Sequence, residues 1–168
     1  MYSLSDVEEI ADAPRRTITF WIEQGVIRPE PGTDGAGRGV HRQFSADEVV
    51  IACMLRAASQ DHVIPYGRLR AISGVLRTQL KSEVAFRKTV NQAVSGEVNL
   101  FLILEPKASD GYFRVGVFPV LKTSEDKDKV NLWHDTIQSL IEDSSRETCS
   151  KTIVFTNPWL SKVRERLK

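Results

Sequence analysis

The chain has 168 residues, of which 41% are hydrophobic and 27% are charged. These fractions are close to globular averages and exclude a wholly disordered chain. No apolar run approaches the ~18 residues of a membrane-spanning helix, and the first residues lack the features of a secretory signal. Cys53 and Cys149 lie far apart and outside any Cys/His cluster, which argues against a disulfide framework and a structural zinc site and fits a reducing cytoplasm.

Positive charge is concentrated in the first half of the chain, although the net charge is only +1. Residues 13–81 carry ten basic side chains against six acidic ones, and nine of the ten are arginines. Arginine is suited to bidentate contacts with phosphate and guanine. Composition alone favours a merely solvated surface, so any case for nucleic acid has to come from motifs.

Two short helices are predicted at the start of the chain. Ser5 and Glu8 have the spacing of a capping box and predict a helix with Ser5 as its N-cap. Pro14 is expected to be the first residue of a second helix, which Gly25 ends. Residues 30–40 hold four glycines and a proline, so they predict an irregular loop.

Two longer helices follow this loop. Ser45 and Glu48 form a second capping box, which predicts a helix over residues 46–60. Pro65 is expected to open the next helix. Its apolar residues recur at helical spacing and predict one buried stripe made of Leu69, Ile72, Leu76 and Leu80.

The second half of the chain is predicted to mix helices and strands. A helix ended by Gly96 is expected from the spacing of its apolar residues, Val84, Phe86, Val90 and Val94. Strands are expected over residues 98–104 and 112–121, as an antiparallel pair, and over 153–155. Further helices are expected over residues 130–141 and from Pro158 onward.

The order of elements in the first half predicts a winged helix-turn-helix. Residues 14–24 are the candidate recognition helix, because the major groove admits one α-helix. Residues 30–44 are the candidate wing, where glycines let the backbone approach phosphate. The predicted fold class is α+β, with a DNA-binding domain over residues 1–81 and a small α+β domain over 82–168.

Three segments resemble the MerR family of bacterial transcription regulators. RTITFWIEQGVI, at residues 16–27, resembles the family's recognition helix, and GVHRQFSADEV, at 39–49, resembles the end of its wing. VIPYGRLRAI, at residues 63–72, resembles its following helix. Thr19 and His41 depart from the family pattern, since they replace a basic residue and a tyrosine.

The resemblance implies a cytoplasmic homodimer that binds a near-palindromic promoter site in double-stranded DNA, with RNA polymerase as a further partner. Arg15, Arg16 and Thr17 would lie at the major groove, and Arg15 and Arg16 remain alternatives as the base reader. The other DNA-contact candidates are an aromatic pair in the helix and three wing residues, which are Phe20, Trp21, Arg38, His41 and Arg42.

Several side chains also have simpler explanations. Phe20 and Trp21 fit core positions, Cys53 fits inert packing, and Arg77 fits a solvated helix face, as do its neighbours Arg68 and Arg70. Trp133, Trp159, Tyr112 and Phe113 fit a ligand pocket, the core of a small domain or a dimer seam.

Two other functions remain open. One is an architectural, excisionase-like protein that bends DNA. The other is a protein-interaction module, such as an antitoxin or adaptor, with an exposed strand edge over residues 98–121. No catalytic motif, cofactor site or metal site is expected, so the protein is not predicted to be an enzyme.

Overall fold

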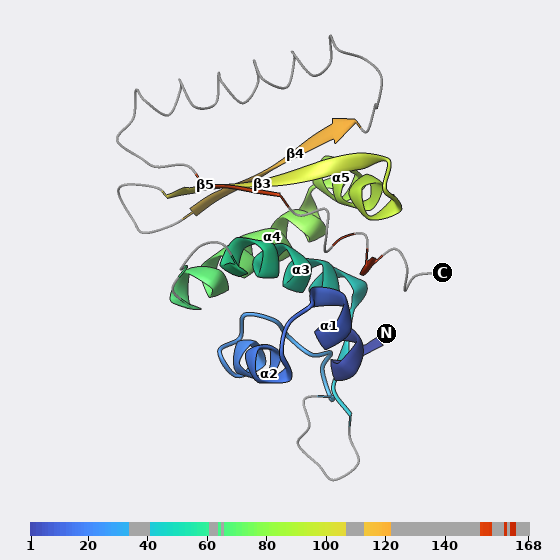
Figure 1. Cartoon of the computed structure of the whole chain (residues 1–168), viewed down its shortest axis with the longest axis vertical. Helices are drawn as coiled ribbons and strands as arrows, with labels where there is room; N and C mark the ends of the chain where they lie inside the picture. Colours follow the sequence, from blue (N-terminus) through green and yellow to red (C-terminus); the bar gives the residue numbers. More distant parts are fainter. Residues whose placement is uncertain are drawn as a thin grey trace.

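The computed structural model describes residues 1–33, 41–60, 64, 66–106, 113–121, 152–155, 160, 162 and 163. The helices are α1 (Leu4–Ala11), α2 (Arg15–Glu23), α3 (Ala46–Gln60), α4 (Tyr66–Ser82) and α5 (Val84–Ser95) (Figure 1). The strands are β1 (Tyr2–Ser3), β2 (Gln43–Phe44), β3 (Val98–Pro106), β4 (Phe113–Leu121) and β5 (Thr152–Phe155).

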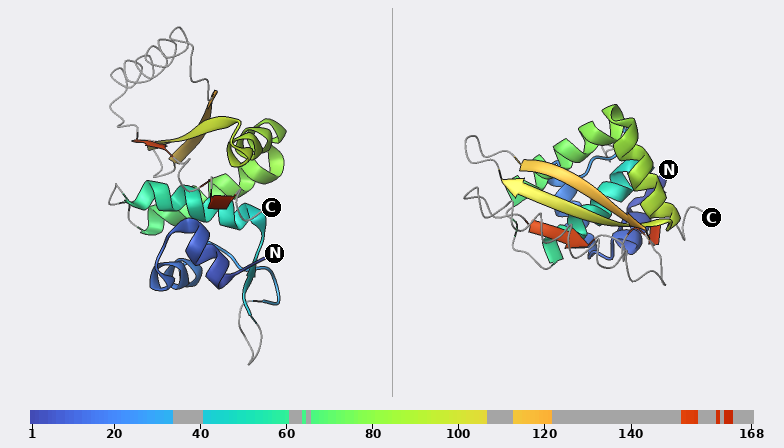
Figure 2. Two further views of the ribbon diagram at one scale, coloured as in Figure 1. Left: turned by 45° about the vertical axis from the view of Figure 1, so that its right-hand side comes forward. Right: turned by 90° about the horizontal axis from the view of Figure 1, so that it is seen from above.

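These elements form three layers (Figures 1 and 2). Helices α1 and α2 lie at one end of the molecule, α3 and α4 form the middle, and the sheet of β3, β4 and β5 lies at the other end beside α5. The sheet order is β4-β3-β5, and both pairings are antiparallel. The predicted hairpin is confirmed, since β3 and β4 pair from Val98↔Leu121 to Pro106↔Phe113.

The first helix begins two residues earlier than the sequence predicts. Ser3, not Ser5, is the N-cap, and its capping box is completed by Asp6. The Asp6 amide donates to Ser3 Oγ at 3.3 Å, and Asp6 Oδ2 accepts from the Ser3 amide at 2.8 Å. The two-residue strand β1 pairs with β2, so the chain is already extended up to Ser3 and turns into the helix there.

Helix α3 is the centre of the core. Residues 49–55 are buried without a break, so α3 has no solvent-exposed face over this stretch. A helix that is apolar on all sides needs packing partners on all sides. The partners are α1, α4 and β5, and the same core cluster includes the buried Leu160 and Val163.

The apolar stripe predicted for α4 is confirmed, because Leu69, Ile72, Leu76 and Leu80 are all buried. The face predicted for α5 needs one correction. Val84 is 84% exposed, since it lies at the first position of α5 and points away from the buried side. That side consists of Phe86, Val90, Ala93 and Val94, and the helix ends at Gly96 as predicted.

Some predicted elements lie outside the described residues. These are the helix over residues 130–141 and most of the helix expected from Pro158. Within the described ranges, no helix is both long and apolar enough to cross a membrane.

Candidate nucleic-acid interface

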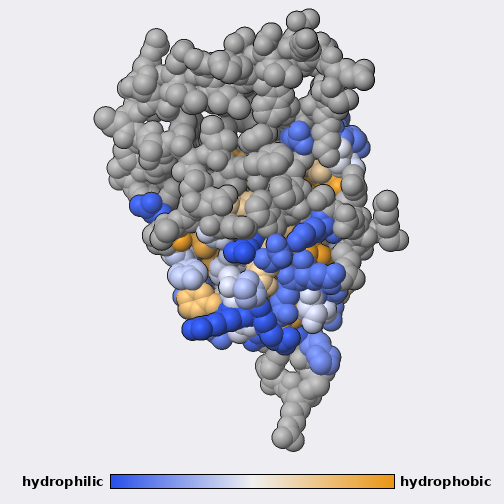
Figure 3. All heavy atoms as spheres, viewed as in Figure 1, coloured by the Kyte–Doolittle hydropathy of each residue, from blue (hydrophilic) through white to orange (hydrophobic). Residues whose placement is uncertain are grey.

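The exposed face of α2 borders an open groove of about 750 Å³. Four predicted DNA-contact residues line this groove together with three others, and the complete lining is Arg15, Arg16, Thr17, Thr19, Phe20, Glu23 and Tyr66. Figure 3 shows mainly hydrophilic surface at this end of the molecule, with a small hydrophobic patch beside it. A groove that combines arginine and threonine side chains with an aromatic edge is chemically suited to the base edges and backbone of a duplex.

Local backbone geometry presents the start of α2 to solvent. Asp12 adopts a left-handed conformation (φ 51°) and ends α1, and Pro14 precedes α2 as its N-cap. The Pro14 carbonyl accepts hydrogen bonds from the amides of Thr17 (2.8 Å) and Ile18 (3.2 Å). Because the first turn of a helix has unpaired N–H groups and the positive end of the dipole, this turn favours an anion such as phosphate.

The opposite face of α2 anchors the helix. Ile18 is fully buried and Trp21 is 1% exposed. Gly25 (φ 68°) follows the helix in the left-handed region, as expected for the residue after a C-cap. Trp21, a DNA-contact candidate, therefore lies in the core, where it fits the packing role that its position also suggested.

The two candidate base readers differ in their surroundings. Arg15 Nη1 lies 3.6 Å from Glu8 Oε1 on α1, and the Arg15 side chain is 68% exposed. Arg16 is exposed and, among the described residues, makes no hydrogen bond or ion pair. The guanidinium of Arg16 is thus the less constrained of the two.

Tyr66 is a groove residue that the sequence did not indicate. Its ring lies edge-on to Phe20, with centroids 4.4 Å apart and an interplanar angle of 66°. Tyr66 is 52% exposed although it precedes Leu69 by three residues and so appears to continue the buried stripe of α4. Tyr66 is the first residue of α4 and lies outside the core, so its ring remains on the surface.

The base of the wing is held by a short set of hydrogen bonds. The Glu30 amide donates to the Gln43 carbonyl (2.7 Å), and the Gln43 amide donates to Thr33 Oγ1 (3.1 Å). His41 is exposed and Arg42 is half-buried, next to β2. The third wing candidate, Arg38, lies outside the described residues. The two described wing candidates thus flank a base that lies at the same end of the molecule as α2 (Figure 1).

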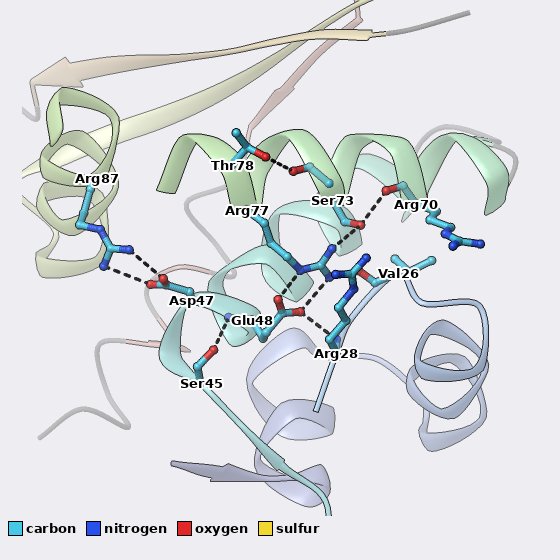
Figure 4. A network of polar contacts seen from close by, with 11 residues as sticks. Val26, Arg28, Ser45, Asp47, Glu48, Arg70, Ser73, Arg77, Thr78 and Arg87 are labelled. Carbon is cyan, nitrogen blue, oxygen red and sulfur yellow. Dashed lines mark hydrogen bonds and ion pairs between the residues drawn. The ribbon is translucent and has the colours of Figure 1, made fainter. Parts of the chain in front are cut away.

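Arg77 is not solvated, which corrects the sequence prediction. Its side chain is only 11% exposed and forms an ion pair with the buried Glu48, whose side chain is 9% exposed (Figure 4). Arg77 Nε donates to Glu48 Oε1, and Nη2 donates to Glu48 Oε2 at 2.9 Å. Sequence reasoning missed this pair because its members are 29 residues apart and each fits a surface position on its own helix.

The role predicted for Glu48 in capping is half right. Its amide donates to Ser45 Oγ at 3.3 Å, as in a capping box. Its carboxylate, however, accepts the amide of Arg28 at 2.9 Å and the fork of Arg77. The carboxylate therefore bonds to Arg28 and Arg77 in place of the Ser45 amide, which it would accept in a complete capping box.

The remaining chemical candidates do not form a second site in the described part of the chain. Cys53 is buried, its Sγ lies 3.9 Å from the Ile10 carbonyl, and burial raises the pKa of its thiol to about 12, although nearby Lys162 opposes the rise. The prediction of inert packing is confirmed. No group of three potential metal ligands occurs among the described residues. Tyr112, Trp133 and Trp159 lie outside them.

Comparison with known proteins gives a family match for the first part of the chain. Residues 2–63 match the family described as MerR HTH family regulatory protein. The matched range runs from β1 past the end of α3, so it contains α2 and the wing base. No curated protein matches the chain.

Proposed function

We propose that this protein is a sequence-specific transcription regulator, because residues 2–63 match the MerR HTH family of regulatory proteins. In this proposal it binds a near-palindromic promoter site in double-stranded DNA as a cytoplasmic homodimer. Each protomer inserts α2 into the major groove of one half-site. The wing, over residues 30–44, contacts the flanking backbone.

The observation that carries the proposal is the composition of the groove along α2. Arg15, Arg16 and Thr17 project from the first turn of a helix whose other face is anchored by Ile18 and Trp21. Arginine reads guanine and holds phosphate, whereas the buried pair fixes the angle at which the helix is presented. Phe20 and Tyr66 add an apolar edge that suits sugar and thymine methyl groups.

The wing and the second half of the chain have separate proposed roles. His41 and Arg42, together with Arg38, contact phosphate or the minor groove. Residues 82–168 dimerise and receive a signal, and the dimer distorts the DNA between its half-sites so that RNA polymerase gains or loses access. The boundary at residue 81 falls at the end of α4, although the core continues from α4 into α5 and β3.

Selection of bound duplexes from a random DNA library tests this proposal. The full chain is incubated with the library at near-physiological salt, and the retained duplexes are sequenced. Enrichment of an inverted repeat supports both specific readout and a dimer, and the spacing of the half-sites gives the separation of the two α2 helices.

Two other results would replace the proposal. Binding at low salt without any enriched sequence would favour the architectural protein that bends DNA, because backbone contacts alone are sequence-independent and salt-sensitive. Absence of binding at every salt concentration would refute the DNA-binding function of the free protein and favour the protein-interaction module.

A further inference from the structure

The buried pair of Glu48 and Arg77 grips the connection between α2 and the wing (Figure 4). This connection is the segment Val26–Arg28. Glu48 Oε2 accepts the Arg28 amide at 2.9 Å, and Arg77 Nη2 donates to the Val26 carbonyl at 2.5 Å. Two charged side chains from α3 and α4 thus hold both ends of a three-residue segment.

The backbone amides along this connection change partners in a regular order. The amides of Val26 and Ile27 donate to the Trp21 carbonyl, so they belong to the end of α2. The Glu30 amide donates to the Gln43 carbonyl, so it belongs to the wing base. Between these two groups, Pro29 has no amide hydrogen, and the Arg28 amide donates to Glu48. Glu48 therefore provides the hydrogen bond at the junction of helix and wing.

The pair is built for orientation more than for stability. A buried ion pair gains little over an apolar pair of similar size, because both charges lose their hydration. Here, however, both carboxylate oxygens and all three guanidinium nitrogens are used, with Arg77 Nη1 reaching Ser73 Oγ at 3.3 Å. A planar guanidinium bonded in this way fixes direction as well as distance.

We propose that Glu48 and Arg77 are positioning residues for DNA binding, which set the wing base at a fixed angle to α2. This inference rests on the proposed function. Neither side chain touches DNA in this proposal, since their exposed fractions are only 9% for Glu48 and 11% for Arg77. They act through Val26 and Arg28, so that α2 and the wing reach the duplex together. Since Arg77 belongs to α4, the angle also depends on the helix that leads into the second half of the chain.

The main test is the double variant Glu48→Met with Arg77→Met in the full chain. Removing one partner leaves a buried unpaired charge and would unfold part of the protein, whereas removing both charges with similar volume keeps the fold. The double variant should remain folded and unfold cooperatively in urea, at a midpoint lowered by the loss of the hydrogen bonds to Val26 and Arg28. It should nevertheless lose roughly three- to thirtyfold in affinity for the duplex selected by the wild type.

Amide exchange provides a readout that needs no DNA. In the free double variant, the amide of Arg28 and the amides of the wing base should exchange faster than in the wild type, while those of α2 should not. The matched control is Asp47→Asn with Arg87→Gln, which removes an exposed ion pair (2.8 Å) from the neighbouring residue of α3. That pair joins α3 to α5 and does not contact residues 26–28, so the control should match the wild type in both assays.

The outcomes separate the two proposals. A folded double variant with wild-type affinity and wild-type exchange would overturn the positioning role while leaving the proposed function intact. If the wild type itself bound no duplex, the proposed function would fail and the role in DNA binding with it. Should the double variant not fold, Arg77→Lys serves instead, because lysine keeps the charge but its three donors cannot replace the four hydrogen bonds of the planar guanidinium to Glu48, Val26 and Ser73. Unchanged affinity and exchange in that variant would equally refute the inference.

Discussion

Replacing Arg16 by alanine separates base reading from folding. Arg16 is exposed and, in the described part of the chain, makes no hydrogen bond or ion pair. Its removal should therefore change the free energy of unfolding by less than ~0.5 kcal/mol. If Arg16 reads a guanine, the same change should cost about 1–3 kcal/mol of binding free energy, and preference should relax at one base position of the half-site.

Arg15→Ala is the matched comparison on the same turn of α2. Arg15 lies 3.6 Å from Glu8 Oε1, an ion pair whose Arg15 side is 68% exposed, so it contributes about 0–1 kcal/mol to stability. Glu8 also competes with DNA for this guanidinium. We therefore expect Arg15 to contact phosphate, so that Arg15→Ala weakens binding to all duplexes by a similar factor.

The assay measures the affinity of each variant for the selected duplex. It also measures the affinity for a set of duplexes in which each base pair of one half-site is replaced in turn. Urea unfolding of each variant provides the stability control. The reasoning would be refuted if Arg16→Ala kept the full wild-type preference at every position. It would also be refuted if Arg15→Ala, and not Arg16→Ala, relaxed the preference.

Three further predictions concern the wing and the core. Arg42→Ala should weaken binding to all sequences alike and reduce the slope of log affinity against log salt by about 0.9, measured by salt titration. Phe44→Ala, which empties a fully buried ring position in β2, should lower the free energy of unfolding by about 3–5 kcal/mol in urea titrations. In the folded protein, burial raises the pKa of the Cys53 thiol to about 12 from its ordinary value of 9.0, which applies in the unfolded chain. The unfolded state therefore binds fewer protons between these values, and stability should fall as pH rises above 9, more steeply than in Cys53→Ala.

Local signals predicted the helices and the hairpin but not the junctions between them. The apolar spacing of α4 and the pattern of β3 and β4 were sufficient, because each describes one element by itself. The start of α1 was wrong because Ser3 and Ser5 are both followed by an acid three residues later. The choice between them is made by pairing of β1 with β2, about 40 residues away, which no local pattern contains.

The candidate site shows the same division. The arginines at the start of α2 were predicted as DNA contacts because a turn, a helix and a glycine-rich loop occur in order along the chain. Tyr66 and the pair of Glu48 and Arg77 were missed because their significance depends on which helices become neighbours. The sequence already gave Glu48 a plausible local partner in Ser45, so nothing in it pointed to Arg77 as the partner.

The C-terminal residues have a consequence for how the protein is made. Lys162 Nζ lies 3.4 Å from Asp12 Oδ2 at the end of α1, and the adjacent Val163 is completely buried in the common core. A ribosome delivers α1, α2 and α3 long before it delivers these residues. Part of the apolar surface of these early helices therefore stays exposed until residues 160–163 are synthesised. Contacts between residues so far apart in the sequence also slow folding. A nascent chain stalled before residue 160 should then be more sensitive to protease than the finished protein, even within α1.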